Sequence, residues 1–458
     1  MAARSLALAA VLSFGCVSTS IDEAALHSAA DARQRQAGLA RAQLPRDVNA
    51  LLARPLTADA AVQVALLNNR GLRASLEQLA IARAGLSGVR RLPNPTLEGA
   101  LRFGGEGDPE VEVGAMIDVT ELLLVLSRGG ATAAGVEAAR LDAVAAILDL
   151  AFETRAAFVE LQAALQQLEL RGTVQQAFGA SADLAGRLRE AGNITELERA
   201  TQQSVALEAR LSYQRAERNV AAARERLNGL MGLWGRGTGW AAVPRLPEPA
   251  GNELPIETLE AEAVRRSLDL EIAKQRFTAA AKRSNVATAA GWLPELRAGV
   301  SAERDEAWAV GPAVELELPL FYQGQGEVAL ARAAMRQQQN VYTDTAVRLR
   351  ARAREAATRL RAAREAVGYF REVLLPLKQK VLDETQLQYN AMAAGAFQLL
   401  AAKRDQIESA SAYIDQLREY WLARTEAEQL LAGRFGARLA DPDATTAVRA
   451  PGAAEQAH

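Results

Sequence analysis

Two stretches of the chain, LREAGNITELERATQQ (188–203) and AMAAGAFQLLAAKRDQ (391–406), decide the fold that the sequence predicts. Each places an Ala-Gly pair inside a run of strong helix formers and follows the glycine with an apolar residue two positions later. Glycine tolerates the left-handed backbone of a tight helix end, so it marks a natural place for a helix to reverse. Gly192 and Gly395 therefore predict the tips of two long antiparallel helical hairpins.

The sequence around the two tips predicts long helices. No proline occurs between Pro109 and Pro244, and Ala, Leu, Glu, Gln and Arg dominate this part of the chain. Residues 129–190 alone would form about 90 Å of helix at about 1.5 Å per residue. After the second tip, apolar residues recur every seven positions, which is typical of coiled-coil packing. They are Leu400, Ile407, Ile414 and Trp421.

The chain contains an internal duplication. Leu92-Pro93 and Leu293-Pro294 lie 201 positions apart, and Gly192 and Gly395 lie 203 apart. A Gly- and Pro-rich linker, 234–255, separates a first repeat (56–233) from a second (256–436). Each repeat is predicted to hold a helix, two strands and a long helical hairpin. Gly172 and Pro376 fall at matching positions before the tips and predict a break in the helix of both repeats.

Four segments, 95–104, 110–119, 295–303 and 308–318, alternate apolar and polar residues as β-strands do. Their length suits tilted transmembrane strands, and apolar-out, charged-in alternation is typical of a lipid-facing, water-filled barrel. The alternative is four ordinary half-buried strands against a core. In the barrel, the charged positions would line a wet pore. They are Glu98, Arg102, Glu110, Glu112, Asp118, Arg297, Glu315 and Glu317.

Four strands cannot close a barrel, since about eight are needed even for a filled one. Open strand edges are not tolerated in lipid, so copies of the chain must combine. Two copies give 8 strands and three give 12, and a water-filled lumen favours three. The predicted fold is therefore mainly α with a transmembrane β-barrel. Duplicated helical hairpins form a trimeric α-barrel, and four β-strands per chain complete a 12-stranded barrel.

The two ends of the chain carry different signals. MAARSLALAAVLSFGC has one Arg, a short apolar run and a small residue before a lone cysteine, which predicts a signal peptide (1–15) and lipidation at Cys16. Ordinary cleavage with a spare cysteine is the alternative. Residues 16–55 would then be a lipid-anchored N-terminal segment. No later stretch is apolar for 18 residues, so any membrane span is expected to be β. The tail, 437–458, is expected to be disordered.

Composition excludes most catalytic and binding classes. The net charge of −2 gives no reason to expect nucleic-acid binding. The two histidines, His27 and His458, lie near the ends, and there is one cysteine, which disfavours a histidine metal site or a Ser-His-Asp triad. No Walker A, HExxH or CxxC motif occurs. We therefore expect no enzyme activity, no cofactor and no bound metal.

The order of the motifs resembles the TolC-type outer-membrane factor family, the exit ducts of tripartite efflux pumps and type I secretion systems. The resemblance covers roughly 56–436. It rests on the duplicated layout and on LNNRGLRA (67–74), RLPNPTLEG (91–99), REAGNITELERA (189–200), ELPLFYQGQGEVALARA (317–333) and AAGAFQLLAAKRDQI (393–407).

The resemblance implies a homotrimer in outer-membrane lipid, with a helical tunnel through the periplasm that conducts substrates passively. Its tips would dock against a periplasmic adaptor (membrane fusion) protein and an inner-membrane transporter of RND type. Similarity to lipidated metal-efflux ducts favours heavy metals or copper as cargo. The tip residues are Gly192, Asn193, Ile194, Gly395, Ala396 and Phe397.

The expected tunnel gate departs from the family pattern. Some members close the tunnel with aspartates six and nine residues after the second tip glycine, where this chain has Ala401 and Arg404. Arg404 and Asp405 could instead form a network with Glu196 or Glu198, or all four could be solvated helix charges. An alternative function is a lipidated periplasmic adaptor or coiled-coil scaffold, which would need a larger β-rich portion beside one hairpin.

Overall fold

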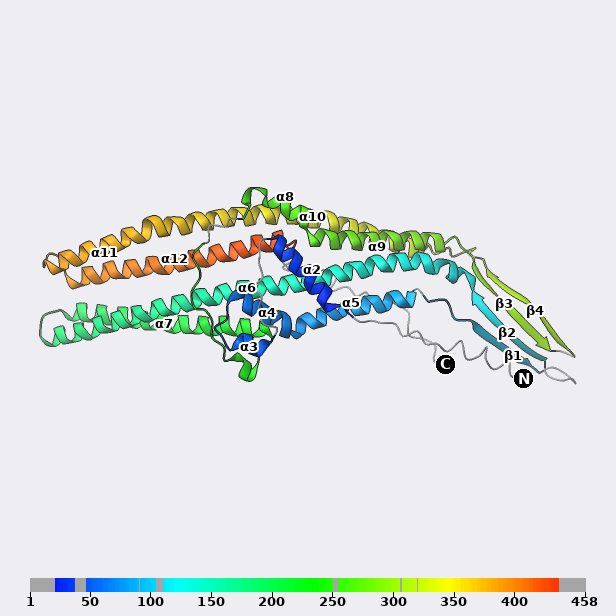
Figure 1. The fold of residues 1–458 in the computed structure, drawn as a ribbon, viewed down its shortest axis with the longest axis horizontal. Coiled ribbons are helices and arrows are strands. Elements are labelled where there is room, and N and C mark those ends of the chain that lie inside the picture. Colours follow the sequence, from blue (N-terminus) through cyan, green and yellow to red (C-terminus); the bar gives the residue numbers. More distant parts are fainter. Residues whose placement is uncertain are drawn as a thin grey trace.

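The computed structural model describes residues 21–37, 47–89, 91–103, 110–249, 254–304, 307–318 and 320–435. The predicted signal peptide, Cys16 and the predicted C-terminal tail lie outside these residues. A four-stranded sheet occupies one end of the elongated chain, and the tips of two helical hairpins lie at the other (Figure 1). The predicted mainly α fold, with four strands and two long hairpins, is confirmed.

The long outgoing arm is a single unbroken helix in the first hairpin and an interrupted helix in the second. In the first, α6 (Val119–Glu190) is a single helix of 72 residues that returns as α7 (Glu196–Met231). In the second, α10 (Gln325–Tyr369), the π-helical turn η3 (Phe370–Leu374) and α11 (Leu375–Asn390) together form one arm. The arm returns as α12 (Ala396–Leu431).

The predicted break at Gly172 is therefore wrong, whereas the second repeat does break near Pro376. Glycine costs only about 1 kcal/mol inside a helix, and a Cβ at Gly172 would meet the Tyr213 ring of α7 at 3.4 Å. Glycine thus allows close packing there. Pro376 lacks an N–H, so it cannot continue the α-helical ladder, and just before it the Leu375 N–H donates to Phe370 O, five residues back.

Shorter helices repeat a bent pair in each half of the chain. In the first half, α4 (Ala58–Asn68) meets α5 (Arg70–Val89), and in the second, α8 (Leu259–Arg266) meets α9 (Leu268–Ala290). At each bend, a side-chain oxygen accepts a hydrogen bond from a backbone N–H of the next helix. The distance is 2.8 Å from Leu72 N to Asn69 Oδ1 and 3.1 Å from Leu270 N to Ser267 Oγ. The remaining short elements are α2 (Glu23–Gln36), α3 (Val48–Leu52), η1 (Gly235–Thr238) and η2 (Ile256–Thr258).

The hairpins end against these two bends. Gly232 follows α7 and Gly433 follows α12, and both have a left-handed backbone, with φ of 64° and 96°. A Cβ at Gly232 would lie 2.9 Å from Asn68 O, and one at Gly433 would lie 2.5 Å from Arg266 O. Only glycine fits both the conformation and the close approach. The same junction therefore occurs in both halves, as the duplication predicts.

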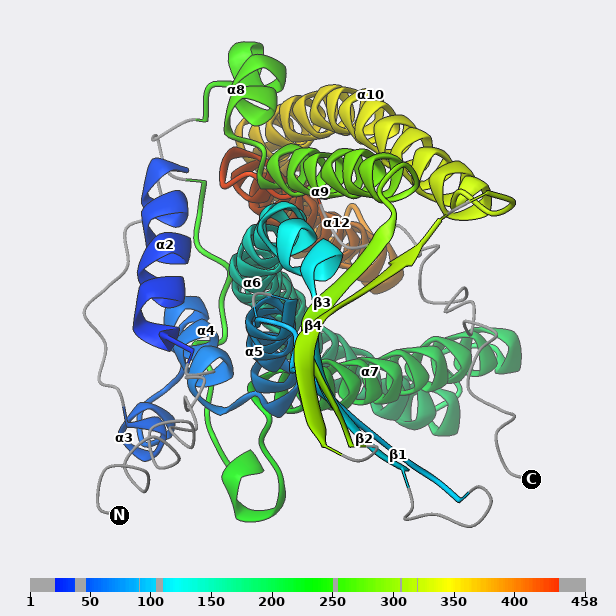
Figure 2. The same cartoon turned by 90° about the vertical axis from the view of Figure 1, so that its right-hand side faces the viewer.

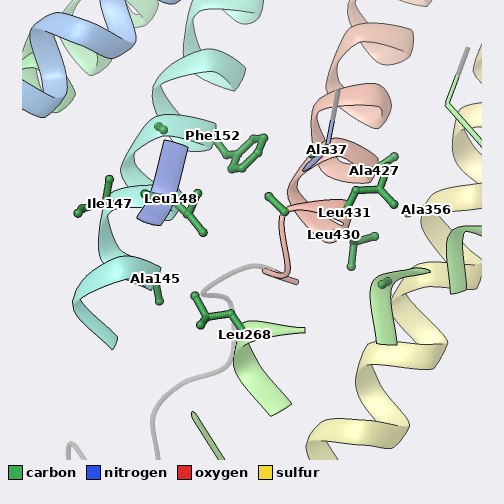
Figure 3. Close-up of a cluster of buried hydrophobic side chains, with 14 of the residues drawn as sticks. Ala37, Ala145, Ile147, Leu148, Phe152, Leu268, Ala356, Ala427, Leu430 and Leu431 are labelled. Carbon is green, nitrogen blue, oxygen red and sulfur yellow. The ribbon is translucent and has the colours of Figure 1, made fainter. Parts of the chain in front are cut away.

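The main core lies where the two halves meet, in the middle of the molecule. Apolar side chains from α2, α6, α9, α10 and α12 pack there, including Leu148, Phe152, Leu268 and Leu430 (Figure 3). Each such side chain contributes about 1.5–3 kcal/mol when fully buried. A second cluster around Phe158 joins α4, α6 and α7. This packing fixes the origin of both hairpins.

The strands form one antiparallel sheet in the order β1-β2-β3-β4. They are β1 (Thr96–Arg102), β2 (Glu110–Asp118), β3 (Glu295–Arg304) and β4 (Trp308–Glu317). In the described residues β1 and β4 have no partner strand on their outer sides. None of the described helices combines the length and apolar character needed to cross a bilayer.

Candidate functional site

The register of the sheet places all eight predicted pore-lining residues on one face. Residues directly opposite each other on neighbouring strands point to the same side. Arg102 pairs with Glu110, and Arg297 pairs with both Asp118 on β2 and Glu315 on β4. Residues two positions apart on one strand share that side, which adds Glu98, Glu112 and Glu317. Glu295 and Glu303, which the sequence analysis did not single out, lie on this charged face as well.

The charged face is predominantly acidic. It carries two guanidiniums, of which Arg102 contacts Glu112 at 3.1 Å and Arg297 contacts Glu295 and Glu315 at 3.3 and 3.6 Å. These ion pairs are exposed and screened by solvent, so they contribute little to the stability of the sheet. Eight carboxylates of the described strands share this face with these two guanidiniums, and the face therefore has a negative potential.

Apart from Arg304 at the end of β3, the opposite face of the sheet is apolar, and the described residues do not cover it. Leu97 is 81% exposed, Val310 71% and Val314 68%. Such a continuous exposed apolar face is unusual for a protein in water and marks contact with lipid or another protein. The alternative of ordinary half-buried strands against a core is excluded for the described chain. Other exposed members are Leu101, Val113, Ile117, Val300, Trp308 and Leu316.

The first tip is a glycine-ended helix turn followed by a capped helix. Gly192 has φ of 76°, and the Asn193 N–H donates to Leu188 O at 2.8 Å, which closes the last turn of α6. Thr195 then caps α7, since its hydroxyl accepts from Glu198 N at 3.2 Å and its N–H donates to the Glu198 carboxylate at 2.7 Å. Gly192 and Asn193 are exposed and Ile194 is half-buried.

The second tip has the same turn with different residues. Met392 takes the left-handed position, with φ of 58°, and the Ala393 N–H donates to Gln388 O at 2.8 Å. Gly395 is instead the N-cap of α12, with φ of −80°, and its N–H donates to Gln398 Oε1 at 3.1 Å. Met392 is therefore the structural counterpart of Gly192, and Gly395 that of Thr195. The predicted equivalence of the two glycines is wrong. Gly192 and Gly395 lie 203 residues apart, whereas equivalent positions of the two turns lie 200 residues apart.

The other two predicted tip residues, Ala396 and Phe397, begin α12 and are exposed. Met392, which the sequence analysis missed, lies at the apex and is 95% exposed. Its only sequence signal was its place between Ala391 and Ala393. The second tip also differs in charge: 385–402 contains no charged residue, whereas the first tip carries Arg189 and Glu190 before its turn and Glu196 after it.

The four candidate gate residues pair within their own hairpins. Arg404 contacts Glu408 at 2.9 Å, and Asp405 contacts Lys378 at 3.4 Å. Glu196 binds Arg199 and lies 3.4 Å from Arg189, while Glu198 belongs to the Thr195 cap. The structure thus does not bring Arg404 or Asp405 to Glu196 or Glu198.

The two hairpins nevertheless touch closer to the core. Val174 and Phe178 of α6, Ala209 of α7 and Ile407 of α12 form a small buried cluster. Beside it, Arg171, Glu208 and Arg404 line a cavity of about 160 Å³. Arg404 therefore faces the seam between the hairpins, even though its ion pair is local.

The linker after η1 forms a strap over both hairpins, a contact that no pattern in the sequence indicates. On α6, Gln162 donates to Val243 O at 3.0 Å, and Gln166 accepts from Leu246 N at 3.0 Å. On α12, Trp421 donates to Pro247 O and Tyr413 donates to Glu248, both at 2.8 Å. The strap thereby connects the first hairpin to the second (Figure 1).

Buried carboxylates lie near the base of α12. Glu428 contacts Arg424 at 3.0 Å, and Arg155, 4.0 Å away, also binds Asp59 at 2.6 Å. Burial raises the pKa of Glu428 in spite of the two arginines. Burial likewise raises the pKa of Glu426, which pairs with Arg352 and Arg359. No group of three or more metal-ligating side chains occurs among the described residues.

Comparison with known proteins gives a consistent picture of the fold. No protein-family model matches the chain. The cobalt-zinc-cadmium resistance protein CzcC of Cupriavidus metallidurans is 22% identical over 397 residues, which span 82% of this chain and 90% of that protein. A membrane protein from Pseudomonas aeruginosa superposes with a TM-score of 0.70 at 21% identity, over 82% of this chain and 90% of that one. The CmeC outer membrane channel of Campylobacter jejuni superposes with a TM-score of 0.72 at 15% identity, over 82% and 85%.

Proposed function

Because the chain has the fold of TolC-type outer-membrane channels, as its motifs predict, we propose that it is the outer-membrane exit duct of a tripartite efflux system. The sheet carries this proposal. One of its faces is acidic and the other is an exposed apolar surface, and both edge strands lack a partner among the described residues. Lipid on one side and water on the other would satisfy both faces.

The proposed assembly is a homotrimer. Neither sheet edge can remain open in lipid, so β1 of one copy pairs with β4 of the next, and three copies give 12 strands. The six hairpins of the three copies follow directly from the strands and would form a helical tunnel that reaches into the periplasm. Cys16 would add a lipid anchor at the outer membrane.

The proposed partners act at the hairpin tips. A periplasmic adaptor (membrane fusion) protein would dock there and connect the duct to an inner-membrane transporter of RND type. Energy comes from that transporter, because the duct itself conducts passively. The tips are suited to docking because both are held by hydrogen-bonded turns and present exposed side chains.

Divalent heavy-metal cations are the proposed cargo. CzcC, a relative of this chain, is a cobalt-zinc-cadmium resistance protein. The acidic face of the sheet would attract cations into the pore and exclude anions. An exposed row of separate carboxylates attracts cations without holding them tightly, which is what passage requires.

Native mass spectrometry of the protein extracted in mild detergent tests this function. We expect a complex of three chains, each beginning at Cys16 with added acyl mass. Three chains that begin elsewhere would retain the duct and remove the lipid anchor. A monomer, or a protein released without detergent, would contradict the duct and favour the adaptor or scaffold.

A further inference from the structure

A basic cavity of about 840 Å³ opens between α2, α6 and the junction of α8 with α9. Four guanidiniums line it: Arg33 from α2, Arg140 from α6, and Arg265 and Arg266 from the end of α8. Among the described residues of the lining, Glu271 is the single carboxylate. Figure 2 shows α2 beside α6, with α8 above them. These lining elements lie in the helical middle of the molecule, between the sheet and the tips (Figure 1).

Three of these arginines form ion pairs with nearby carboxylates. Arg140 forms a two-pronged pair with Glu137, with contacts of 2.7 to 3.0 Å. Arg265 and Arg266 share Glu262. Glu271 lies 3.7 Å from Lys274, so it too is engaged.

Arg33 is the lining guanidinium that forms no ion pair within 4 Å with a carboxylate of the described residues. Its hydrogen bond is from Nη1 to the backbone oxygen of Arg266 at 2.9 Å. Burial and the neighbouring Arg140 lower the pKa of Arg33, whereas the nearby Glu271 acts in the opposite direction. The hydrogen bond to Arg266 O uses one of the five N–H groups of the guanidinium. Most N–H donors of this guanidinium therefore lack an anionic acceptor.

We propose that this basic cavity binds a polyvalent oxyanion, such as phosphate or a polycarboxylate, between Arg33 and Arg140. The planar guanidinium matches two oxygens of one anionic group at once. The volume is in the range of small-molecule sites. Because Arg33 belongs to α2 and Arg140 to α6, the anion would fasten the N-terminal helix to the base of the first hairpin.

A free anion is the expected source, and a lipid headgroup is not. Arg140 lies 21 residues beyond the start of α6 at the sheet, which corresponds to about 32 Å of helix. A headgroup bordering the sheet is out of reach over that distance. The choice of a free anion rests on the proposed position of the sheet in lipid, whereas the oxyanion site itself concerns the helical middle alone.

Isothermal titration calorimetry with inorganic phosphate tests the inference. The full chain is held in neutral detergent, and ionic strength is kept constant with chloride. We expect saturable binding, weakened at least about tenfold in Arg33→Gln and in Arg140→Gln, because each removes a charge-assisted hydrogen bond. Arg33→Lys keeps the positive charge and a donor to Arg266 O, so we expect this variant to fold. It should bind phosphate more weakly than the parent, because an ammonium lacks the planar pair of donors. Arg245→Gln, on an exposed arginine paired with Glu169, is the control and should bind as the parent does.

Three outcomes would overturn the inference. The first is a heat of phosphate titration that is no greater than the heat of a chloride titration. A second is equal weakening in the Arg245→Gln control, which would indicate non-specific attraction. The third is loss of phosphate binding when phosphatidylglycerol is added to the micelles, since a lipid headgroup would then be the occupant.

Discussion

Met392 holds a backbone conformation that only glycine adopts without cost. Left-handed geometry costs an ordinary residue about 1 kcal/mol or more, and Gly192 fills the same position of the first tip. We therefore expect Met392→Gly to stabilise the second tip and Gly192→Ala to destabilise the first, each by about 1 kcal/mol. Nothing lies within 4 Å of a Cβ at Gly192, so its cost would come from the backbone alone.

Hydrogen–deuterium exchange of the two tip peptides measures both changes. Exchange around 385–402 should slow in Met392→Gly, and exchange around 188–200 should become faster in Gly192→Ala. Unchanged or faster exchange in Met392→Gly would show that the methionine side chain stabilises the tip more than its backbone strains it.

Glu428 should make stability depend on pH. Burial raises its folded pKa above the ordinary value of about 4.3, so the folded state binds a proton more readily than the unfolded one. The contribution to stability is present below pH 4 and is lost as pH rises through the folded pKa. Glu428→Gln cannot titrate, so its unfolding free energy relative to the parent should increase as pH rises from 4 to 7. Chemical unfolding at several pH values measures this; a constant difference would contradict it.

At the scale of elements, the two faces of β4 should respond oppositely to the same new charge. Val314 lies on the apolar face and its neighbour Ala313 on the charged face. An arginine facing lipid costs about 2–4 kcal/mol near the bilayer centre. We expect Val314→Arg to reduce the yield of detergent-extracted trimer strongly, while Ala313→Arg remains close to the parent. Equal losses would mean that both faces are packed or that neither meets lipid.

The strap is a second element whose removal should be measurable. Trp421→Phe and Tyr413→Phe each delete one hydrogen bond from α12 to the strap, to Pro247 O and to Glu248. Each loss should cost about 1 kcal/mol and increase proteolytic cleavage within 241–249. Tyr342→Phe, on an exposed side chain of α10, is a matched control. Cleavage at the parental rate in both strap variants would show that the α6 contacts alone hold it.

Features that depend on residues close together in the sequence were predictable, whereas features that depend on residues far apart were not. Alternation along the strands and helix-forming composition are local signals, so the four strands and both hairpins were predictable. The positions of both tips were predictable. The equal role predicted for Gly192 and Gly395 was wrong, because a glycine can either end a helix, as Gly192 does, or precede one, as Gly395 does. The strap and the Arg33 cavity depend on contacts such as Gln162 with Val243 and Arg33 with Arg266, 81 and 233 residues apart. Such pairs leave no periodic pattern in the sequence.

At the scale of the whole molecule, the acidic face of each sheet should determine which ions pass. In the proposed trimer the three acidic faces would surround one lumen, and their negative potential would add. We therefore expect the reconstituted protein to prefer cations, as judged by the reversal potential across a planar bilayer under a salt gradient. Glu112 and Glu303 lie directly opposite each other on β2 and β3, so the double variant Glu112→Gln/Glu303→Gln removes two adjacent charges.

The double variant should shift the reversal potential toward zero, because the lumen loses six carboxylates in three copies. Arg304→Gln, on the opposite face of β3, is the control and should leave selectivity unchanged. Screening weakens such effects, so the preference should also decline as salt rises from 0.1 to 1 M, where the Debye length falls from about 10 to 3 Å. An anion-preferring pore, or one that the double variant does not change, would show that the charged face of the sheet does not line the conducting path.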